Sequence, residues 1–137
     1  CVAFSPDGKI LAVGDGESTI GLFESGNVLL YDPATGEVKS TLSGHSQPVS
    51  CLAFKPGDPN ILVTGSWDKT LKIWDLSTAA SACLSTVTGH SRPVRSVAWN
   101  NDGTKLVSGS SDETVKIWSV GSAGTFECQS TLNGHSG

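Results

Sequence analysis

The sequence has few basic residues, and they do not form a patch. Nine Lys and Arg stand against thirteen Asp and Glu in the 137 residues, which gives a formal net charge of −4 at pH 7. The sequence has only two arginines, Arg92 and Arg95, and they lie close together. Binding to phosphate backbones or to anionic lipids depends on clustered Lys and Arg. The composition therefore argues against nucleic acid or a membrane surface as the main partner.

Long apolar runs and closely spaced cysteines are also missing. No run approaches the length of about 18 residues that a membrane-spanning helix needs. None of the four cysteines, Cys1, Cys51, Cys83 and Cys128, forms a C-x-x-C pair, which argues against zinc or thioredoxin-like chemistry. Cys1 and Cys51 occupy equivalent places in the repeats, as do Cys83 and Cys128, and such places are too far apart to bridge. We predict four reduced thiols packed in strands and an intracellular location, in the cytoplasm or nucleus.

Repetition is what the sequence has in abundance. "GHSQPVSCLAF" at 44–54 returns as "GHSRPVRSVAW" at 89–99, and "ILVTGSWDKTLKIWD" at 61–75 returns as "KLVSGSSDETVKIWS" at 105–119. A third Gly-His at 134–135 keeps the same spacing of 45 residues. The opening "CVAFSPDGKILAVGD" follows the same plan from its middle onward. Repeats of this length indicate an array of equivalent structural units.

Each repeat contains short segments that are typical of strands. "VSCLAF", "ILVTGS", "TLKIW" and "CLSTVTG" are rich in β-branched and aromatic residues. Turn-forming clusters such as "SPDG", "KPGDPN" and "NNDG" separate the strands. No stretch has the helical apolar period of about 3.6 residues. The sequence therefore predicts an all-β fold with four strands in each unit.

The order of these motifs resembles the WD-repeat family of β-propellers. The resemblance implies four-stranded antiparallel blades, which we place at 1–43, 44–88 and 89–133, with 134–137 opening a further repeat. Propellers close with about 4–8 blades, so three blades leave two faces uncovered. We therefore expect a fragment of a longer protein or, alternatively, assembly with a second copy that supplies the remaining blades.

The first unit departs from the pattern. Its Gly-His is missing, and two aromatic residues compete for the position of the repeated Trp. Counting nine residues from Gly14 leads to Phe23, whereas counting back from Gly44 favours Tyr31. We favour Tyr31, with an insertion within about 15–26. Because this unit lacks a complete set of signature polar residues, we expect it to be the least stable.

The resemblance implies a hydrogen-bonded chain of polar side chains within each complete blade. In the second blade the matching positions are His45, Thr64 or Ser66, Asp68 and Trp74, and in the third they are His90, Ser108 or Ser110, Asp112 and Trp118. The two alternatives in each blade point to the same face of a strand, so spacing does not separate them. A hydrolytic triad is rejected, because the same trio occurs twice and is tied to a Trp each time.

No motif supports an enzyme, a cofactor or a metal site. The sequence has no phosphate-binding glycine loop, no metal-ligand spacing and no G-x-S-x-G turn. In propellers of this family, partner peptides dock on the face that carries the loops before the first strand and between the second and third. The matching candidates are Gln47, Ser50, Trp67, Arg92, Arg95 and Ser111.

Trp67 is the most informative candidate, because the sister repeat has the small Ser111 in its place. An exposed Trp in a turn is a typical interaction anchor, although the ring could instead lie on its own blade or cover the stem of Lys69. The same difference argues against a glycan-binding propeller, which would repeat the aromatic residue. The sequence thus predicts a non-catalytic scaffold that binds peptides or protein surfaces. The alternative is a structural module that completes a propeller with another chain.

Overall fold

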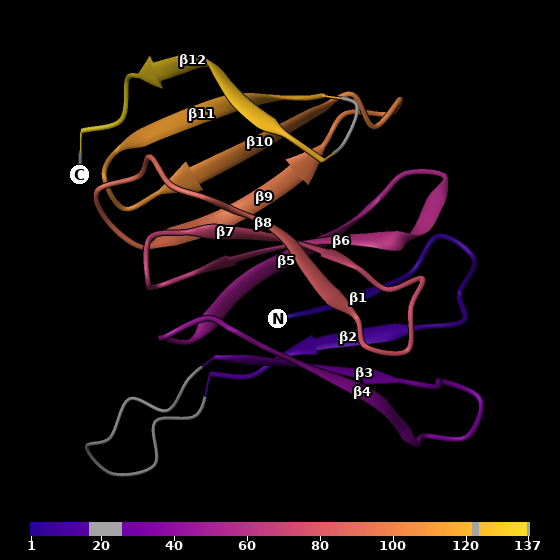
Figure 1. Cartoon of the computed structure of the whole chain (residues 1–137). Helices are drawn as coiled ribbons and strands as arrows, with labels where there is room; N and C mark the ends of the chain where they lie inside the picture. Colours follow the sequence, from indigo (N-terminus) through magenta and orange to yellow (C-terminus); the bar gives the residue numbers. More distant parts are fainter. Residues whose placement is uncertain (17–25, 122–123, 137) are drawn as a thin grey trace, which may run out of the picture.

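The computed structural model describes residues 1–16, 26–121 and 124–136. All regular elements in these ranges are strands, arranged as three separate antiparallel sheets (Figure 1). The strands of the three sheets are, in chain order, β1 (Val2–Phe4), β2 (Leu11–Gly14), β3 (Asn27–Tyr31) and β4 (Val38–Ser43); β5 (Val49–Lys55), β6 (Asp58–Ser66), β7 (Leu71–Asp75) and β8 (Ala82–Val87); and β9 (Val94–Trp99), β10 (Lys105–Ser110), β11 (Thr114–Val120) and β12 (Phe126–Asn133).

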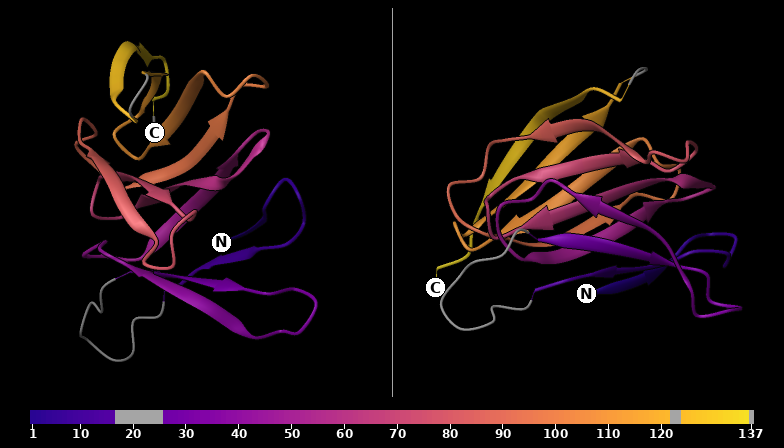
Figure 2. Two further views of the ribbon diagram at one scale, coloured as in Figure 1. Left: turned by 45° about the vertical axis from the view of Figure 1, so that its right-hand side comes forward. Right: turned by 60° about the horizontal axis from the view of Figure 1, so that its bottom comes forward.

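Each sheet is a simple meander in which consecutive strands pair. The three sheets fan out side by side like blades, and they do not close into a ring within the described residues (Figure 2). The first strands lie nearest to one another, with β5 in contact with both β1 and β9. The predicted fold class, three four-stranded antiparallel blades that this chain alone does not close, is confirmed.

The core lies between the sheets. One buried cluster joins the first and second sheets, and includes Val28, Val49 and Trp74. A second cluster joins the second and third sheets, and includes Ile73, Val94 and Trp118. Each sheet therefore buries its apolar faces against its neighbours, as expected for stacked repeats.

The first strand shows what happens where no sheet covers that face. Phe4 of β1 and Phe54 of β5 occupy the same position of the repeat, but Phe4 is 62% exposed and Phe54 only 9%. Phe54 packs in the cluster between the first two sheets. Within the described residues, nothing covers β1 from its outer side.

Tyr31 takes the register position of the repeated Trp. It lies opposite Leu11, as Trp74 lies opposite Leu62 in the second sheet. A bulge precedes the aromatic residue in both sheets. The competing candidate, Phe23, lies outside the described residues, as does most of the predicted insertion at 15–26.

All four cysteines are free, but their surroundings differ from the prediction of four packed thiols. Cys1, Cys83 and Cys128 are exposed, and Cys1 precedes the first residue of β1. Only Cys51 is packed, against the cluster between the second and third sheets. The outer strands β8 and β12 face solvent along much of their length, which exposes the two thiols they carry.

Candidate functional site

A continuous chain of hydrogen bonds crosses the second sheet. His45 Nδ1 lies 2.8 Å from Asp68 Oδ2, and its Nε2 lies 2.7 Å from Thr64 Oγ1. The indole Nε1 of Trp74 donates to the same Thr64 oxygen over 2.9 Å. Because the ionised carboxylate only accepts, His45 donates from Nδ1, and a neutral ring then accepts the Thr64 hydroxyl proton at Nε2.

The third sheet repeats this geometry. His90 Nδ1 lies 2.8 Å from Asp112 Oδ2, and His90 Nε2 lies 2.8 Å from Ser108 Oγ. Trp118 donates its indole N–H to Ser108 Oγ over 2.8 Å. In both sheets the imidazole and indole rings also meet edge to face.

The structure distinguishes the alternatives that the sequence left open. Thr64 and Ser108 are the hydroxyl members of the two hydrogen-bonded chains. Ser66 and Ser110 instead donate to the loops before β5 and β9. Ser66 Oγ donates to the Gln47 carbonyl over 2.9 Å, and Ser110 Oγ donates to that of Arg92 over the same distance. Each complete sheet therefore has one hydroxyl inside the chain and another that ties the turn to the loop beside it.

Two threonines that sequence reasoning missed complete the site. The Thr70 hydroxyl donates to Asp68 Oδ1 over 2.6 Å, and the Thr114 hydroxyl makes the same bond to Asp112. Both threonines occur at the same offset in the repeated phrases "DKT" and "DET". That identity was a usable signal, because an Asp in a turn accepts a hydrogen bond from the backbone N–H two residues later, where a threonine can add its hydroxyl.

These bonds change the acidity of the two carboxyl groups. Burial of Asp68 opposes its ionisation, but hydrogen bonds from His45 and Thr70 outweigh burial and hold its pKa well below the ordinary value. At Asp112, burial likewise opposes ionisation, and hydrogen bonds from Thr114 and His90 lower the pKa well below the ordinary value. Both groups are therefore ionised acceptors at neutral pH.

The polar chain has no access for a substrate. Thr64 and Ser108 are both 0% exposed, and His45 is buried beside Thr64. A nucleophilic hydroxyl has to meet its substrate and an oxyanion-binding group.

Among the described residues, no group of three or more His, Cys, Asp or Glu is placed to hold a metal ion. The same part of the chain contains no helix long and apolar enough to cross a membrane.

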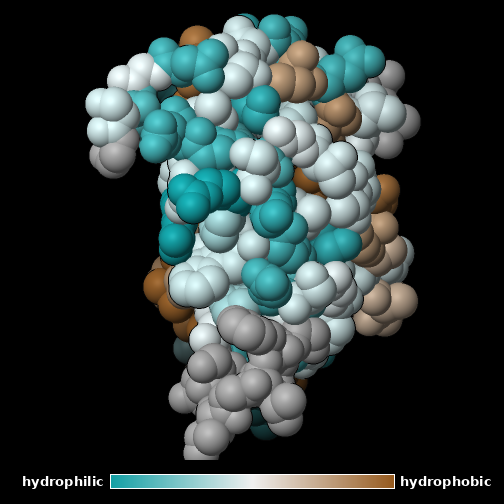
Figure 3. Space-filling view, turned by 90° about the vertical axis from the view of Figure 1, so that its left-hand side faces the viewer, coloured by the Kyte–Doolittle hydropathy of each residue, from teal (hydrophilic) through white to brown (hydrophobic). Residues whose placement is uncertain are grey.

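The turns after β6 and β10 and the loops before β5 and β9 share one end of the sheets, at the left of Figure 1. We call this surface, formed by residues 44–48, 67–70, 88–93 and 111–113, the loop face. Figure 3 looks onto it and shows mainly hydrophilic side chains over its centre. Gln47 is half-buried there and Arg92 is exposed.

Three of the candidate partner-binding residues meet on the loop face. The Arg95 guanidinium lies 4.9 Å from the centre of the Trp67 ring, and Arg95 Nε donates to Ser111 Oγ over 2.7 Å. Trp67 belongs to the second sheet's turn, and the other two residues belong to the third sheet. Ser50 does not join them, because its hydroxyl points to the backbone, where the carbonyls of Gly65 and Val94 both lie within hydrogen-bonding distance.

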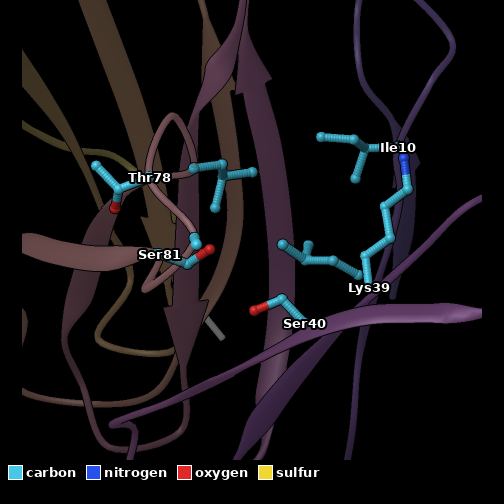
Figure 4. A pocket seen from close by; sticks show the side chains of 8 residues that line it. Ile10, Lys39, Ser40, Thr78 and Ser81 are labelled. Atoms are coloured by element: carbon cyan, nitrogen blue, oxygen red, sulfur yellow. The ribbon is translucent and has the colours of Figure 1, made fainter.

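The opposite end of the sheets has two shallow grooves. One, of about 160 Å³, lies between the first and second sheets. Figure 4 shows Lys39 and Ser40 on one side of it, facing Thr78 and Ser81. The other, of about 290 Å³, lies between the second and third sheets and is lined largely by apolar side chains such as Leu84 and Trp99.

Comparison with known proteins identifies the repeats. The family described as "WD domain, G-beta repeat" matches residues 1–24, 36–75 and 81–119. The chain is 42% identical over 94 residues to nuclear distribution protein PAC1 of Komagataella phaffii, which covers 69% of this chain and 17% of that protein. It is 40% identical over 76 residues to the periodic tryptophan protein 2 homolog of Schizosaccharomyces pombe, covering 56% of this chain and 8% of the relative.

A third relative, the transcriptional corepressor LEUNIG_HOMOLOG of Arabidopsis thaliana, is 34% identical over 106 residues, covering 77% of this chain and 12% of that protein. A solved chain from "Crystal Structure of Mitotic Checkpoint Complex" superposes with a TM-score of 0.79 at 30% identity, over 98% of this chain and 36% of that one. The chain thus spans less than a fifth of the length of these curated relatives.

The matched residues cover most of the chain, and the solved neighbour shares its arrangement of sheets. Proteins of this kind serve in general as scaffolds for protein interactions and are generally not catalysts. The chain belongs to the WD-repeat family of β-propeller proteins.

Proposed function

We propose that this chain binds a peptide or a protein surface through its loop face, as a non-catalytic scaffold. The observation that carries the proposal is Trp67, a large apolar side chain that is 40% exposed in the turn after β6. Arg95 of the neighbouring sheet lies against its ring. Trp and Arg are the residues that most often carry the binding energy of protein interfaces.

The polar chain supports this surface from below. Asp68 accepts hydrogen bonds from the backbone N–H groups of Ser46 and Thr70, so it ties the turn after β6 to the loop before β5. The backbone N–H of Trp67 itself donates to the Pro48 carbonyl over 3.0 Å. A turn held in this way presents Trp67 with little freedom to lose, which lowers the entropic cost of binding.

Charge and relatives support an intracellular protein partner. The net charge of −4 makes nucleic acid and anionic membranes poor partners. Similar proteins include a transcriptional corepressor and a pre-mRNA-processing factor, which favours the cytoplasm or nucleus as the location of this chain.

A displayed library of random peptides, selected on the intact protein, tests this proposal. We expect the selected peptides to bind Trp67→Ala at least about tenfold more weakly than the parent, because an anchor residue contributes well over 1 kcal/mol. Leu84→Ala is the matched control, since Leu84 is a similarly exposed apolar side chain at the opposite end of the sheets. Selected peptides that bind Trp67→Ala as tightly as the parent contradict binding through the loop face.

One observation favours the alternative, in which the chain completes a propeller with another chain. Val2 and Phe4 of β1 are strongly exposed, whereas Phe54 at the same repeat position is covered by the preceding sheet. Sedimentation equilibrium of the parent and of Phe4→Glu tests this alternative. A self-associating parent and a monomeric variant support it, and a parent that is monomeric at all concentrations excludes pairing between two copies.

A further inference from the structure

We infer that Arg95, held by Trp67 and Ser111, is a binding site for one oxyanion of a partner peptide, either the carboxylate of an Asp or Glu or the phosphate of a phosphorylated side chain. The inference names the partner chemistry of the loop face, and it therefore rests on the function proposed above. Three features of the structure lead to it: a bulge in β9, the contacts of the guanidinium, and the lack of an ion pair between Arg95 and any carboxylate of the described residues.

The bulge decides where the Arg95 side chain goes. In the pairing of β9 with β10, Val94 lies opposite Ser110 and Ser96 lies opposite Gly109, so Arg95 is an extra residue without a partner in the register. A bulge breaks the alternation of side chains between the two faces and gives the extra residue a new direction. It allows Arg95 to reach the loop face while Val94 stays buried between the sheets.

The second sheet has the same bulge with a different use. Ser50 is the extra residue of β5, between the pairs Val49–Ser66 and Cys51–Gly65. Its hydroxyl points to backbone carbonyls inside the protein. The equivalent bulge in the third sheet therefore carries the long cationic side chain of Arg95, where the second sheet has the short side chain of Ser50.

Two contacts fix the plane of the guanidinium. Nε donates to Ser111 Oγ, and the group stands over the face of the Trp67 ring. Of the five N–H groups of an arginine, Nε–H is used in this way, and the four on the terminal nitrogens make no hydrogen bond to any described residue. Among the described residues, no carboxylate forms an ion pair with Arg95.

An ordered guanidinium with free terminal nitrogens matches the geometry of a carboxylate or a phosphate, which it binds through two parallel hydrogen bonds. Because Trp67 and Ser111 already order the side chain, binding an anion costs less conformational entropy than it does at a freely moving arginine. The exposed part of the Trp67 ring lies beside the cation and offers an apolar surface to the methylene groups of an acidic residue. Trp67 and Ser111 are thus positioning residues for Arg95.

Nuclear magnetic resonance of the ¹⁵N-labelled intact protein tests the site directly. The probes are N-acetyl-glutamate methylamide and N-acetyl-phosphoserine methylamide, with N-acetyl-glutamine methylamide as the uncharged control. We expect saturable shifts of the Arg95 Nε–H and Trp67 indole signals with at least one anionic probe and none with the control. The two anionic arms separate a carboxylate partner from a phosphorylated one.

Three variants and a control sharpen the test. Arg95→Lys keeps the charge but loses the planar fork, and we expect it to bind the preferred probe about fivefold more weakly. Arg95→Gln removes the charge and is expected to lose saturable binding, while Ser111→Ala weakens binding about threefold by freeing Nε. Lys105→Gln, at the opposite end of the third sheet, removes an equal charge and should leave binding unchanged.

The inference is overturned if neither anion gives a saturable shift, or if Arg95→Lys binds as tightly as the parent, since net charge alone then explains the response. The peptide selection separates this failure from failure of the proposed function. Selected peptides that require Trp67 but carry no acidic or phosphorylated residue leave loop-face binding in place and overturn the oxyanion site.

Discussion

Gly65 of β6 lies directly against Val94 of β9 in the neighbouring sheet. A β-carbon added at position 65 would stand 2.6 Å from Sγ of Cys51 and 2.8 Å from Cγ1 of Val94, and Gly14 stands in the same relation to Cys1 and Val49. Each of these glycines leaves room for a valine from the first strand of the next sheet. Through this contact, the second sheet packs closely against the third.

We expect Gly65→Ala to lower the free energy of unfolding by about 1–3 kcal/mol, because the added methyl group overpacks a buried contact. Gly109→Ala is the matched control. A β-carbon there would meet only the Ser96 hydroxyl, at 2.8 Å, which can rotate away. Urea unfolding of both variants measures the difference. Equal losses for the two substitutions would show that the close contacts of position 65 with Cys51 and Val94 are not the cause.

We expect Asp68→Ala to lower the melting temperature markedly. The change removes charge-assisted hydrogen bonds worth about 1.5–3 kcal/mol each and leaves His45 without its acceptor. Binding of any partner peptide should follow the loss of folded protein. Glu37→Ala, at an exposed position, is the control. Equal melting temperatures for Asp68→Ala and the parent would remove the structural role of the polar chain.

The lowered pKa values of Asp68 and Asp112 predict acid sensitivity. In the unfolded chain these carboxyl groups take up protons below about pH 4, whereas in the folded chain they stay ionised to lower pH. Their contribution to stability is therefore complete above about pH 4 and is lost as the pH falls further. We expect the double variant Asp68→Asn, Asp112→Asn to be less stable at pH 6, with a flatter decline between pH 4 and 2.5. A decline as steep as that of the parent would assign the acid sensitivity to other groups.

The thiols should separate into two kinetic classes. Burial raises the pKa of Cys51 to about 11, so hardly any thiolate is present at pH 8. Cys1, Cys83 and Cys128 are exposed. We expect three thiols to react rapidly with an aromatic disulfide reagent and the fourth only on unfolding. Cys51→Ala identifies the slow class by removing it, and four rapid thiols in the native parent would contradict the packing of Cys51.

Hydrogen exchange should show that the first sheet opens most easily. Val13 stands at the repeat position of Thr64, so β2 has no hydroxyl to join a polar chain. The first and third sheets each have a neighbour on one side only, which makes the third sheet the fair comparison. We expect amides of β2 and β3 to exchange about tenfold faster than those of β10 and β11. Equal protection would mean that the polar chain adds little to local stability.

The repeat pattern predicted most of the polar site, because equivalent residues recur at fixed offsets. The partners of His45, Asp68 and Trp74 lie in the same repeat, a few strands away, so local spacing brings them together. The choice of Thr64 over Ser66 was not predictable, since both side chains leave the strand on the same face. The position of the His45 ring along the strand selects Thr64, whose hydroxyl lies 2.7 Å from Nε2.

The contact of Trp67 with Arg95 lay beyond the reach of sequence reasoning. The two residues belong to different repeats, and their approach depends on the stacking of two sheets and on the extra residue in β9. The exposure of Cys83 and Cys128 was missed for a related reason, because a strand-forming sequence does not reveal whether its strand is inner or outer in the sheet.

By itself, the amino-acid order determined the strands, the turns, the number of sheets and the His, Asp and Trp members of the polar chains, because these depend on spacing within one repeat. The tertiary structure alone decided which hydroxyl bridges His45 and Trp74, that Tyr31 stands in the register of the repeated indole, and that an arginine of one blade rests on a tryptophan of another. These outcomes depend on register and on the packing between sheets, where residues far apart in the chain compete for the same space.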